Sequence, residues 1–264
     1  MSNNVILDYQ GSTATITLNR PKNHNAFDSG LISDLTQALS EVKHSTARCL
    51  ILTGAGSTFS AGADLNWMRD MANASEQENY TDALALAVCL RSLNDLSIPS
   101  IARINGSAYG GGVGLISCCD IAVCVDTAKF TLSEVKLGLV PATISPYVIA
   151  AIGKRQARRY FLSAEMIDAK QAQNIGLVHE CVASEQLDET ISRIQYWIGK
   201  AGPDAIKHAK QLIMSYSPAK ESEETKLQDQ NNARLIAQLR ASKEGQEGLN
   251  AFLDKRPAQW IKPQ

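Results

Sequence analysis

The alternation of strand-like and helix-like segments constrains the fold of this chain most. Thr13–Asn19 alternates apolar and polar residues as a half-buried strand does, and Leu31–Val42 repeats apolar residues at helical spacing. Successive strands joined through helices form a parallel sheet with right-handed connections, so we expect a layered α/β fold. The same pattern predicts further strands at Cys49–Gly54, Ser100–Gly106 and Asp120–Val125 and a helix at about Ser75–Leu96.

From about Ser145 onward the chain is mostly helical in pattern. Ser145 is a suitable N-cap and Pro146 a suitable first helical residue, with Gly153 as the exit. We predict a core over residues 1–195 and a C-terminal helical region over residues 196–264, with the joint at Gly202-Pro203. Further predicted helical segments are 154–163, 168–176, 184–200 and a charged run from Glu221 to Leu253.

Charge and apolar content exclude several classes of protein. The 26 Lys and Arg residues nearly balance the 27 Asp and Glu residues, so no global field attracts nucleic acid or an anionic membrane. No apolar run approaches the length of a membrane span, and the start lacks the regions of a signal peptide. We therefore expect a cytoplasmic protein. Six cysteines without metal-ligand spacing are expected to be buried free thiols: Cys49, Cys89, Cys118, Cys119, Cys124 and Cys181.

Glycines gather in two loops. The second loop, "AYGGGVG", packs Gly110, Gly111, Gly112 and Gly114 into five positions before an apolar segment. Neither loop has the spacing of a dinucleotide-binding fingerprint, because the third glycine position of the first loop is Phe59 and the second loop has the wrong interval. Nucleotide-cofactor chemistry is therefore not predicted.

A different use fits both loops. Each follows a strand and precedes a helix, which begins near Asp64 in one case and near Gly111 in the other, so each offers backbone N–H groups at a positive helix end. Two converging N–H groups make an oxyanion hole. The alternative is that the glycines only permit close packing of helix on strand.

Five motifs in order, from "SAGADLNWM" and "INGSAYGGGVGL" through "CCDIAV" and "KFTLSEVKLGLVP" to "DAKQAQNIGLV", resemble the enoyl-CoA hydratase/isomerase (crotonase) superfamily. The resemblance covers nearly the whole chain. It implies a spiral of ββα units with a helical C-terminal trimerisation region, and an assembly as a homotrimer or dimer of trimers. It also implies an acyl-CoA substrate whose coenzyme A arrives as part of the substrate, with no separate cofactor. The cysteine spacing, apolar runs and charge described above predict no metal and no membrane partner, and they do not favour nucleic acid.

The resemblance also implies site residues. The oxyanion donors match the N–H groups of Ala63 and Gly111, and the catalytic glutamate matches Glu134. A carboxylate in a dry pocket suits proton transfer next to a stabilised thioester enolate. Phe252 and Lys255 match positions that reach the coenzyme A of a neighbouring subunit. Residues matching substrate contacts are Lys22, Asn23, His24, Ala61, Asp64, Leu65, Gly110, Phe252 and Lys255.

One position departs from the family pattern. Gly114 stands where hydratases with two catalytic carboxylates have their second glutamate. A single glutamate fits an isomerase that moves a proton between the α- and γ-carbons of a 3-enoyl-CoA. The finer resemblance, however, is to bacterial hydratases of methylglutaconyl-CoA and related branched substrates with an extra carboxylate. We therefore predict a hydratase in which Glu134 works with water and Gly114 leaves room for the branch. The alternatives are the isomerase and a non-catalytic acyl-CoA- or RNA-binding homologue.

Other polar or aromatic residues are weaker candidates. Asn66, Trp67 and Arg69 follow the first loop, and Arg69 is a candidate partner for a substrate carboxylate, although a surface arginine is the commoner role. Tyr109 and Tyr147 are candidate hydroxyl groups or core residues. A basic cluster that would engage phosphates, a neighbouring subunit or only solvent consists of Lys154, Arg155, Arg158 and Arg159.

Overall fold

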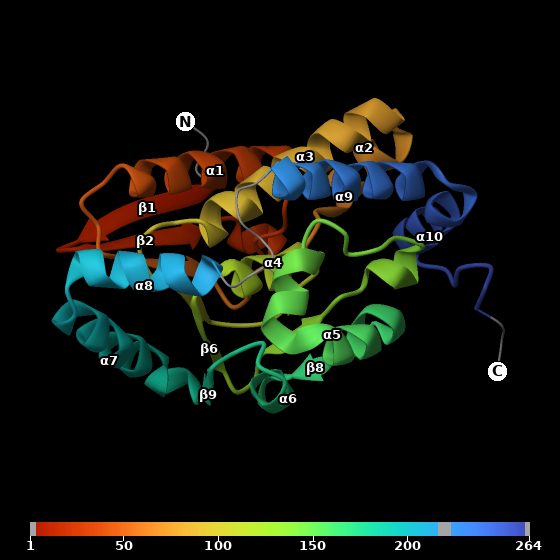
Figure 1. Ribbon diagram of the computed structural model, residues 1–264. Coiled ribbons are helices and arrows are strands. Elements are labelled where there is room, and N and C mark those ends of the chain that lie inside the picture. The colour runs from red at the N-terminus through yellow and green to blue at the C-terminus, as the bar shows by residue number, and fades with distance from the viewer. Residues whose placement is uncertain (1–3, 216–222, 262–264) are drawn as a thin grey trace.

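The computed structural model describes residues 4–215 and 223–261. Two sheets form the centre, one with strand order β1-β2-β3-β4-β6-β9 and a smaller one with order β5-β7-β8 (Figure 1). The strands are β1 Val5–Gln10, β2 Thr13–Leu18, β3 Cys49–Gly54, β4 Ser100–Ile104, β5 Ala108–Tyr109, β6 Ile121–Val125, β7 Lys129–Thr131, β8 Ile167–Asp168 and β9 Glu180–Val182. The α-helices are α1 Ser29–Lys43, α2 Leu65–Asn73, α3 Glu76–Asn94, α4 Gly111–Cys118, α5 Ser145–Ser163, α6 Ala169–Asn174, α7 Leu187–Lys200, α8 Pro203–Ser215, α9 Glu223–Ala241 and α10 Lys243–Leu253.

The strands follow the expected pattern except at the edge. Strand β2 buries every second residue, whereas β3 buries all six. Strands β2, β3, β4, β6 and β9 pair parallel with one another in this order, so the predicted parallel sheet is present. Strand β1 was not predicted, and it pairs antiparallel with β2. Its side chains are mostly exposed, so the sequence carries little apolar pattern there.

The two sheets are built from repeated ββα turns. Strand β4 lies in the large sheet and β5 in the small sheet before α4 begins, and β6 and β7 repeat this order before α5. An isolated bridge between Ser60 and Ala108 ties the first glycine loop to β5. The predicted α/β class and spiral of ββα units are therefore confirmed, and each turn delivers one loop to the same edge of the small sheet.

Caps fix where the helices begin. The Asp28 carboxylate accepts the Leu31 N–H at 2.8 Å and starts α1, whose apolar face packs on β1 and β2. Ser75 and Glu78 form a capping box at the start of α3. Helix α5 begins within one residue of the predicted start, but the Ser145 hydroxyl donates to the Ala142 carbonyl instead of capping the helix.

A glycine divides α5 as expected. Gly153 has φ 72° and ψ 156°, so the helical path is interrupted there. Helix α7 continues through residue 195, and the chain leaves it at Ala201, directly before Gly202-Pro203 and α8. Glu221, the first residue of the predicted charged run, lies outside the described residues. The division into a core and a C-terminal region stays a prediction.

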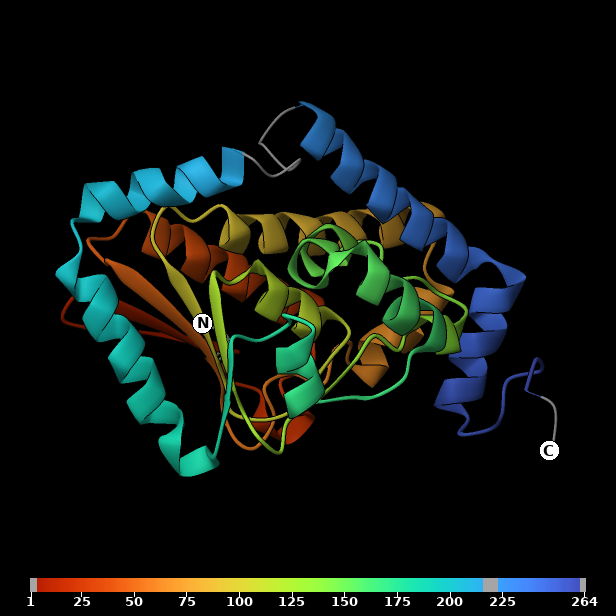
Figure 2. The same ribbon diagram turned by 60° about the horizontal axis from the view of Figure 1, so that its bottom comes forward.

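The C-terminal helices return to the body of the same chain. Helix α9 runs along α3, and α10 packs against α2 and the short 3₁₀ helix η2, Glu134–Leu137 (Figure 2). Four of the six cysteines are buried, while Cys119 and Cys181 are half-buried. Within residues 4–215 and 223–261, no helix is both long and apolar enough to cross a membrane.

Candidate active site

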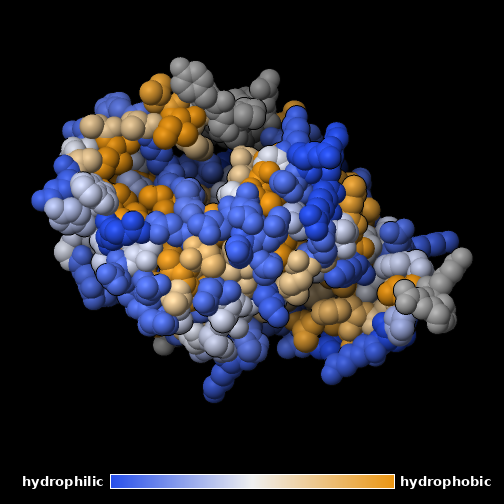
Figure 3. All heavy atoms as spheres, turned by 90° about the horizontal axis from the view of Figure 1, so that it is seen from below, coloured by the Kyte–Doolittle hydropathy of each residue, from blue (hydrophilic) through white to orange (hydrophobic). Residues whose placement is uncertain are grey.

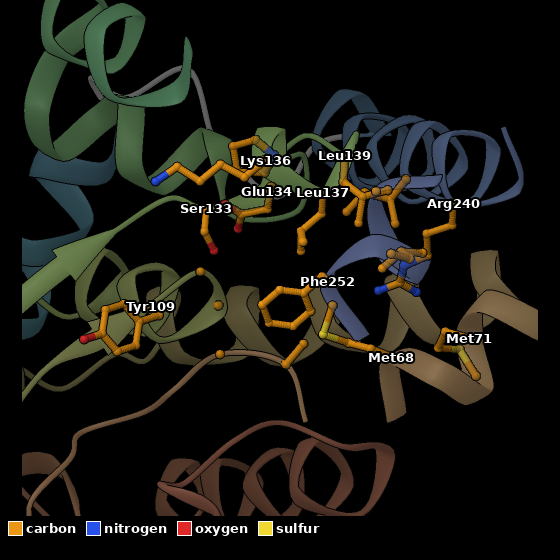
Figure 4. Close-up of a pocket in the computed structure, with 18 of the residues that line it drawn as sticks. Met68, Met71, Tyr109, Ser133, Glu134, Lys136, Leu137, Leu139, Arg240 and Phe252 are labelled. Carbon is orange, nitrogen blue, oxygen red and sulfur yellow. The ribbon is translucent and has the colours of Figure 1, made fainter. Parts of the chain in front are cut away.

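A cavity of about 330 Å³ lies where α2, α9, α10, η2 and the two glycine loops meet. Its wall is mainly apolar and contains Met68, Met71 and Leu137 (Figure 4). Glu134 supplies its one carboxylate among the described lining residues. An apolar cavity with few convergent polar groups is the usual form of a small-molecule site.

The two glycine loops are joined edge to edge. The Tyr109 N–H donates to the Ser60 carbonyl at 2.9 Å, and a Cβ on Gly62 would come within 2.9 Å of the Tyr109 carbonyl oxygen. A Cβ on Gly112 would likewise come within 2.9 Å of the Ser60 Cβ. Glycine is therefore needed at both positions for the loops to approach each other.

This approach puts Ala63 and Gly111 in one cavity wall. Hydrogen bonds to Phe27 hold the residues on either side of Ala63. The Phe27 N–H donates to Gly62 O at 2.6 Å, and the Phe27 carbonyl accepts from Asp64 N at 2.8 Å. Among the described residues, the N–H groups of Ala63 and Gly111 donate to no carbonyl or side chain. Gly111 is the first residue of α4, so its N–H lies at the positive end of that helix.

Glu134 enters the cavity from η2. Its Oε2 atom is buried and has no hydrogen-bond partner among the described residues. Burial raises the pKa of the Glu134 carboxyl to about 7. Gly110 has φ 48° and ψ −116°, and a Cβ there would lie 3.2 Å from Glu134 Oε1. The carboxyl group therefore lies directly beside the turn that starts α4.

The space beside Gly114, the position where a second catalytic glutamate was considered, is filled by other side chains. A Cβ on Gly114 would come within 2.3 Å of Ile144 Cγ2 and 3.5 Å of Leu90 Cδ2. Gly114 is therefore a packing glycine against the start of α5. The expectation that Gly114 leaves room for a substrate branch is wrong in this structure, because the Ile144 side chain occupies that room.

Several residues predicted for the site share the cavity, while others support it from behind. Ala61, Ala63, Gly110, Gly111, Glu134 and Phe252 all line the cavity. The remaining predicted contact residues are outside its lining: Lys22, Asn23, His24, Asp64, Leu65 and Lys255. These six residues do not share one structural role.

The loop before α1 braces the first glycine loop. The Asp64 carboxylate caps α2 by accepting from Asn66 N at 2.9 Å, and it also accepts from Asn23 at 3.0 Å. Its contact with Arg20 is 3.2 Å. Burial alone would raise the pKa of Asp64, but these hydrogen bonds and the Arg20 charge outweigh it and lower the pKa. The His24 carbonyl accepts from Ala61 N at 2.9 Å.

Phe252 belongs to the cavity of its own chain. It comes from α10, which folds back onto α2 and η2 of the same molecule. Lys255 follows with φ 54° and is exposed, outside the cavity lining. Phe252 is 48% exposed, so its predicted reach to a neighbouring subunit, like that of Lys255, stays a prediction.

Of the weaker candidate residues, some line the cavity and others do not. Trp67 and Tyr109 line the cavity, but Tyr147 is buried in the core. Arg69 donates to Asn66 at 2.9 Å on an exposed part of α2, outside the lining. The basic residues of α5, Lys154, Arg155, Arg158 and Arg159, are also outside it.

Two cavity arginines were missed. Arg240 of α9 and Arg256 after α10 both line the cavity. The Arg256 guanidinium is bound to both oxygens of Glu247, at 2.7 and 3.0 Å. Arg240 has no local sequence signal because it lies in a charged helical run, and Arg256 has none because it is one of several charged residues that follow α10.

Comparison with known proteins agrees with this geometry. The family model for enoyl-CoA hydratase/isomerase matches residues 8–263. The chain belongs to the enoyl-CoA hydratase/isomerase family. An acyl-CoA substrate fits this family, and relatives named as enoyl-CoA hydratases support an enzyme of the hydratase type.

Similar family members are known from several bacteria. The chain is 32% identical to a short-chain-enoyl-CoA hydratase of Clostridium acetobutylicum, over 98% of each chain. It is also 32% identical to a 2,3-dehydroadipyl-CoA hydratase of Escherichia coli, over 96% of each chain. The crystal structure of an enoyl-CoA hydratase from Shewanella pealeana is 40% identical with a TM-score of 0.80, covering 98% of this chain and 96% of that one.

Within residues 4–215 and 223–261, no group of three or more His, Cys, Asp or Glu side chains is arranged to hold a metal ion.

The polar groups nearest to Glu134 in sequence that also line the cavity are Ser133 and Lys136. In Figure 4 the Glu134 carboxylate points into the cavity, whereas the Lys136 ammonium points away from it.

Proposed function

We propose that this protein hydrates short or branched 2-enoyl-CoA thioesters, among them substrates of the methylglutaconyl-CoA kind. The observation that carries the proposal is the buried Glu134 carboxyl beside the N-terminus of α4, whose Oε2 atom has no hydrogen-bond partner among the described residues. Relatives named as hydratases at 32% identity over nearly their whole length support the same reaction type.

The thioester oxygen is placed against the N–H groups of Ala63 and Gly111. Both groups lie in the cavity wall without another acceptor among the described residues. As negative charge develops on that oxygen, two fixed donors stabilise the enolate without a counter-ion. One such donor is typically worth about 10²–10³ in rate.

Glu134 then carries the proton. In its ionised form the carboxylate takes a proton from a water molecule while the water oxygen bonds to the β-carbon, and the electron pair of the double bond moves toward the thioester. The same carboxyl returns that proton to the α-carbon. A pKa near 7 suits both halves of this exchange at neutral pH.

The second candidate reaction is isomerisation of a 3-enoyl-CoA to a 2-enoyl-CoA. The packing of Ile144 against Gly114 favours it, because the place of a second carboxylate is closed. Glu134 alone would remove a proton from the α-carbon and return it to the γ-carbon. The oxyanion donors would act in the same way in both reactions.

Rates on matched substrates decide between the two reactions. We expect hydration of straight and branched 2-enoyl-CoA to be faster than the shift of 3-enoyl-CoA by the same enzyme. A much faster shift than any hydration would make the isomerase the correct assignment. If neither reaction occurs but acyl-CoA raises the Tm, the protein is the non-catalytic acyl-CoA-binding homologue.

We also propose assembly as a homotrimer or a dimer of trimers. Large apolar side chains are exposed on α7 and α8, including Trp197 at 66% and Ile213 at 70%. Figure 3 shows apolar residues gathered over α8 beside the grey segment. Exposed apolar patches of this kind are commonly buried by association.

A further inference from the structure

The cavity wall contains one buried guanidinium among apolar side chains. Arg240 projects from α9 into a region lined by Met71, Leu139 and Ile236, and its side chain is 14% exposed. Figure 4 shows the guanidinium directed toward Met68 and Met71, away from the η2 side of the cavity that carries Glu134. Burying a charge in such a wall is costly unless the charge is paired.

Its pairing within the chain is partial. Arg240 Nη1 donates to Asn79 Oδ1 at 3.1 Å and to Asp82 Oδ2 at 3.3 Å. Trp67 Nε1 donates to the other Asp82 oxygen, Oδ1, at 3.0 Å, and the Arg240 guanidinium lies 5.7 Å from the Trp67 ring centroid. Both of these Arg240 hydrogen bonds come from the same nitrogen, Nη1.

The other arginine among the described lining residues shows what full pairing looks like here. Both oxygens of Glu247 bind the Arg256 guanidinium. Arg240 differs from Arg256 because it is held in place through one nitrogen, Nη1.

We propose that Arg240 binds the extra carboxylate of the acyl group, so that the preferred thioesters are those of short dicarboxylic acids. The proposal rests on the proposed function for the acyl-CoA substrate. A guanidinium presents parallel donors that match the two oxygens of a carboxylate. Asn79, Asp82 and Trp67 act as positioning residues that fix the plane of this fork.

Burial also leaves the ion pair incompletely compensated. Desolvation lowers the pKa of Arg240 despite the charge of Asp82. Desolvation likewise raises the pKa of Asp82 despite Arg240 and Trp67. A second carboxylate bound to the guanidinium would therefore stabilise its charge.

The test uses binding, which does not depend on turnover. Titration calorimetry compares glutaryl-CoA with valeryl-CoA, and adipyl-CoA with hexanoyl-CoA, pairs that differ only in the terminal carboxylate. We expect the wild-type protein to bind at least one carboxylated member about 10-fold tighter or more, since hydrogen bonds between a guanidinium and a carboxylate are stronger than those between neutral groups. Arg240→Met should remove this preference, and Arg240→Lys should keep part of it.

Two further variants separate recognition from support of the fold. Asp82→Asn should increase the preference for the carboxylated thioester, because it removes the competing anion, whereas a purely structural pair predicts no change in preference. Arg256→Met is the matched control for a cavity arginine and should leave the preference intact. Equal binding of both members of each pair by the wild-type protein, or an unchanged preference in Arg240→Met, overturns the proposal. Hydration of uncarboxylated 2-enoyl-CoA would then still stand by itself.

Discussion

Glu134 is the residue in which stability and function oppose each other. Its carboxyl is buried with Oε2 unpaired among the described residues, and burial raises its pKa from 4.5 to about 7. Below pH 4.5 the carboxyl is protonated in both the folded and the unfolded protein, so its ionisation does not reduce the free energy of unfolding. As the pH rises to about 7 the free energy of unfolding falls, because the unfolded chain ionises freely whereas the folded protein must hold a buried anion.

Glu134→Gln should therefore change stability in a pH-dependent way. Above pH 7 we expect the variant to be more stable than the wild type by up to about 3 kcal/mol, the equivalent of the pKa difference. The gain should shrink below pH 7 and vanish near pH 4.5. Urea unfolding at several pH values measures this, and a gain that is independent of pH would contradict the assigned cause.

The same variant should lose activity. Removing a general acid–base group typically costs about 10²–10⁴ in rate. For the wild type, kcat/KM should rise with pH and level off above about 7, because the reaction begins from the ionised carboxylate. A Gln variant with wild-type kcat/KM would remove Glu134 from the proposed mechanism.

Gly114 is a residue whose substitution tests packing. Gly114→Ala should lower the free energy of unfolding by about 1–3 kcal/mol, because the new Cβ meets Ile144 Cγ2. Combining it with Ile144→Ala should cost less than the sum of the two single changes, since the second change removes the clash. Thermal unfolding of the four proteins in this cycle gives the coupling, and strict additivity would contradict the contact.

At the scale of elements, the site depends on where η2 meets α10. A Cβ on Gly248 of α10 would come within 2.3 Å of the Leu137 carbonyl oxygen, and a Cβ on Gly138 would come within 2.7 Å of the Glu244 carbonyl oxygen. The two backbones therefore touch directly at reciprocal glycines. Since η2 begins with Glu134, the position of α10 influences the position of the proposed catalytic carboxyl.

Gly248→Ala should consequently impair catalysis from outside the reacting groups. The added methyl group pushes α10 away from η2, so we expect a lower kcat together with a Tm reduced by several degrees. Gly199→Ala is a suitable control, because a Cβ there would meet nothing within 4 Å. Equal kcat in the Gly248 variant would mean that α10 does not position Glu134.

At the scale of the whole molecule, assembly is the open prediction. Exposed apolar residues on α7 and α8, among them Trp197 and Ile213, predict association into the proposed trimer or dimer of trimers. Sedimentation equilibrium should give three or six times the chain mass of 28.6 kDa. Trp197→Glu with Ile213→Glu should shift the mass downward if these helices form the interface, whereas a monomeric wild type would contradict the assembly.

The sequence predicted the large elements and the shared cavity residues well, and it failed where contacts are distant along the chain. Glu134 and Gly111 were found because they lie in motifs with fixed local spacing. Arg240 was missed because only the return of α9 along α3 brings it to the cavity. The room assigned to Gly114 was wrong because Ile144, from a different element, fills it.

The seating of α10 on η2 has a consequence for how the protein is made. Glu134 leaves the ribosome well before α10, so a nascent chain with a folded sheet and both glycine loops still lacks the wall that holds its carboxyl in place. The cavity closes only after Gly248 has reached Leu137. The wall around Glu134 is therefore complete only once α10 has been synthesised and has packed against η2.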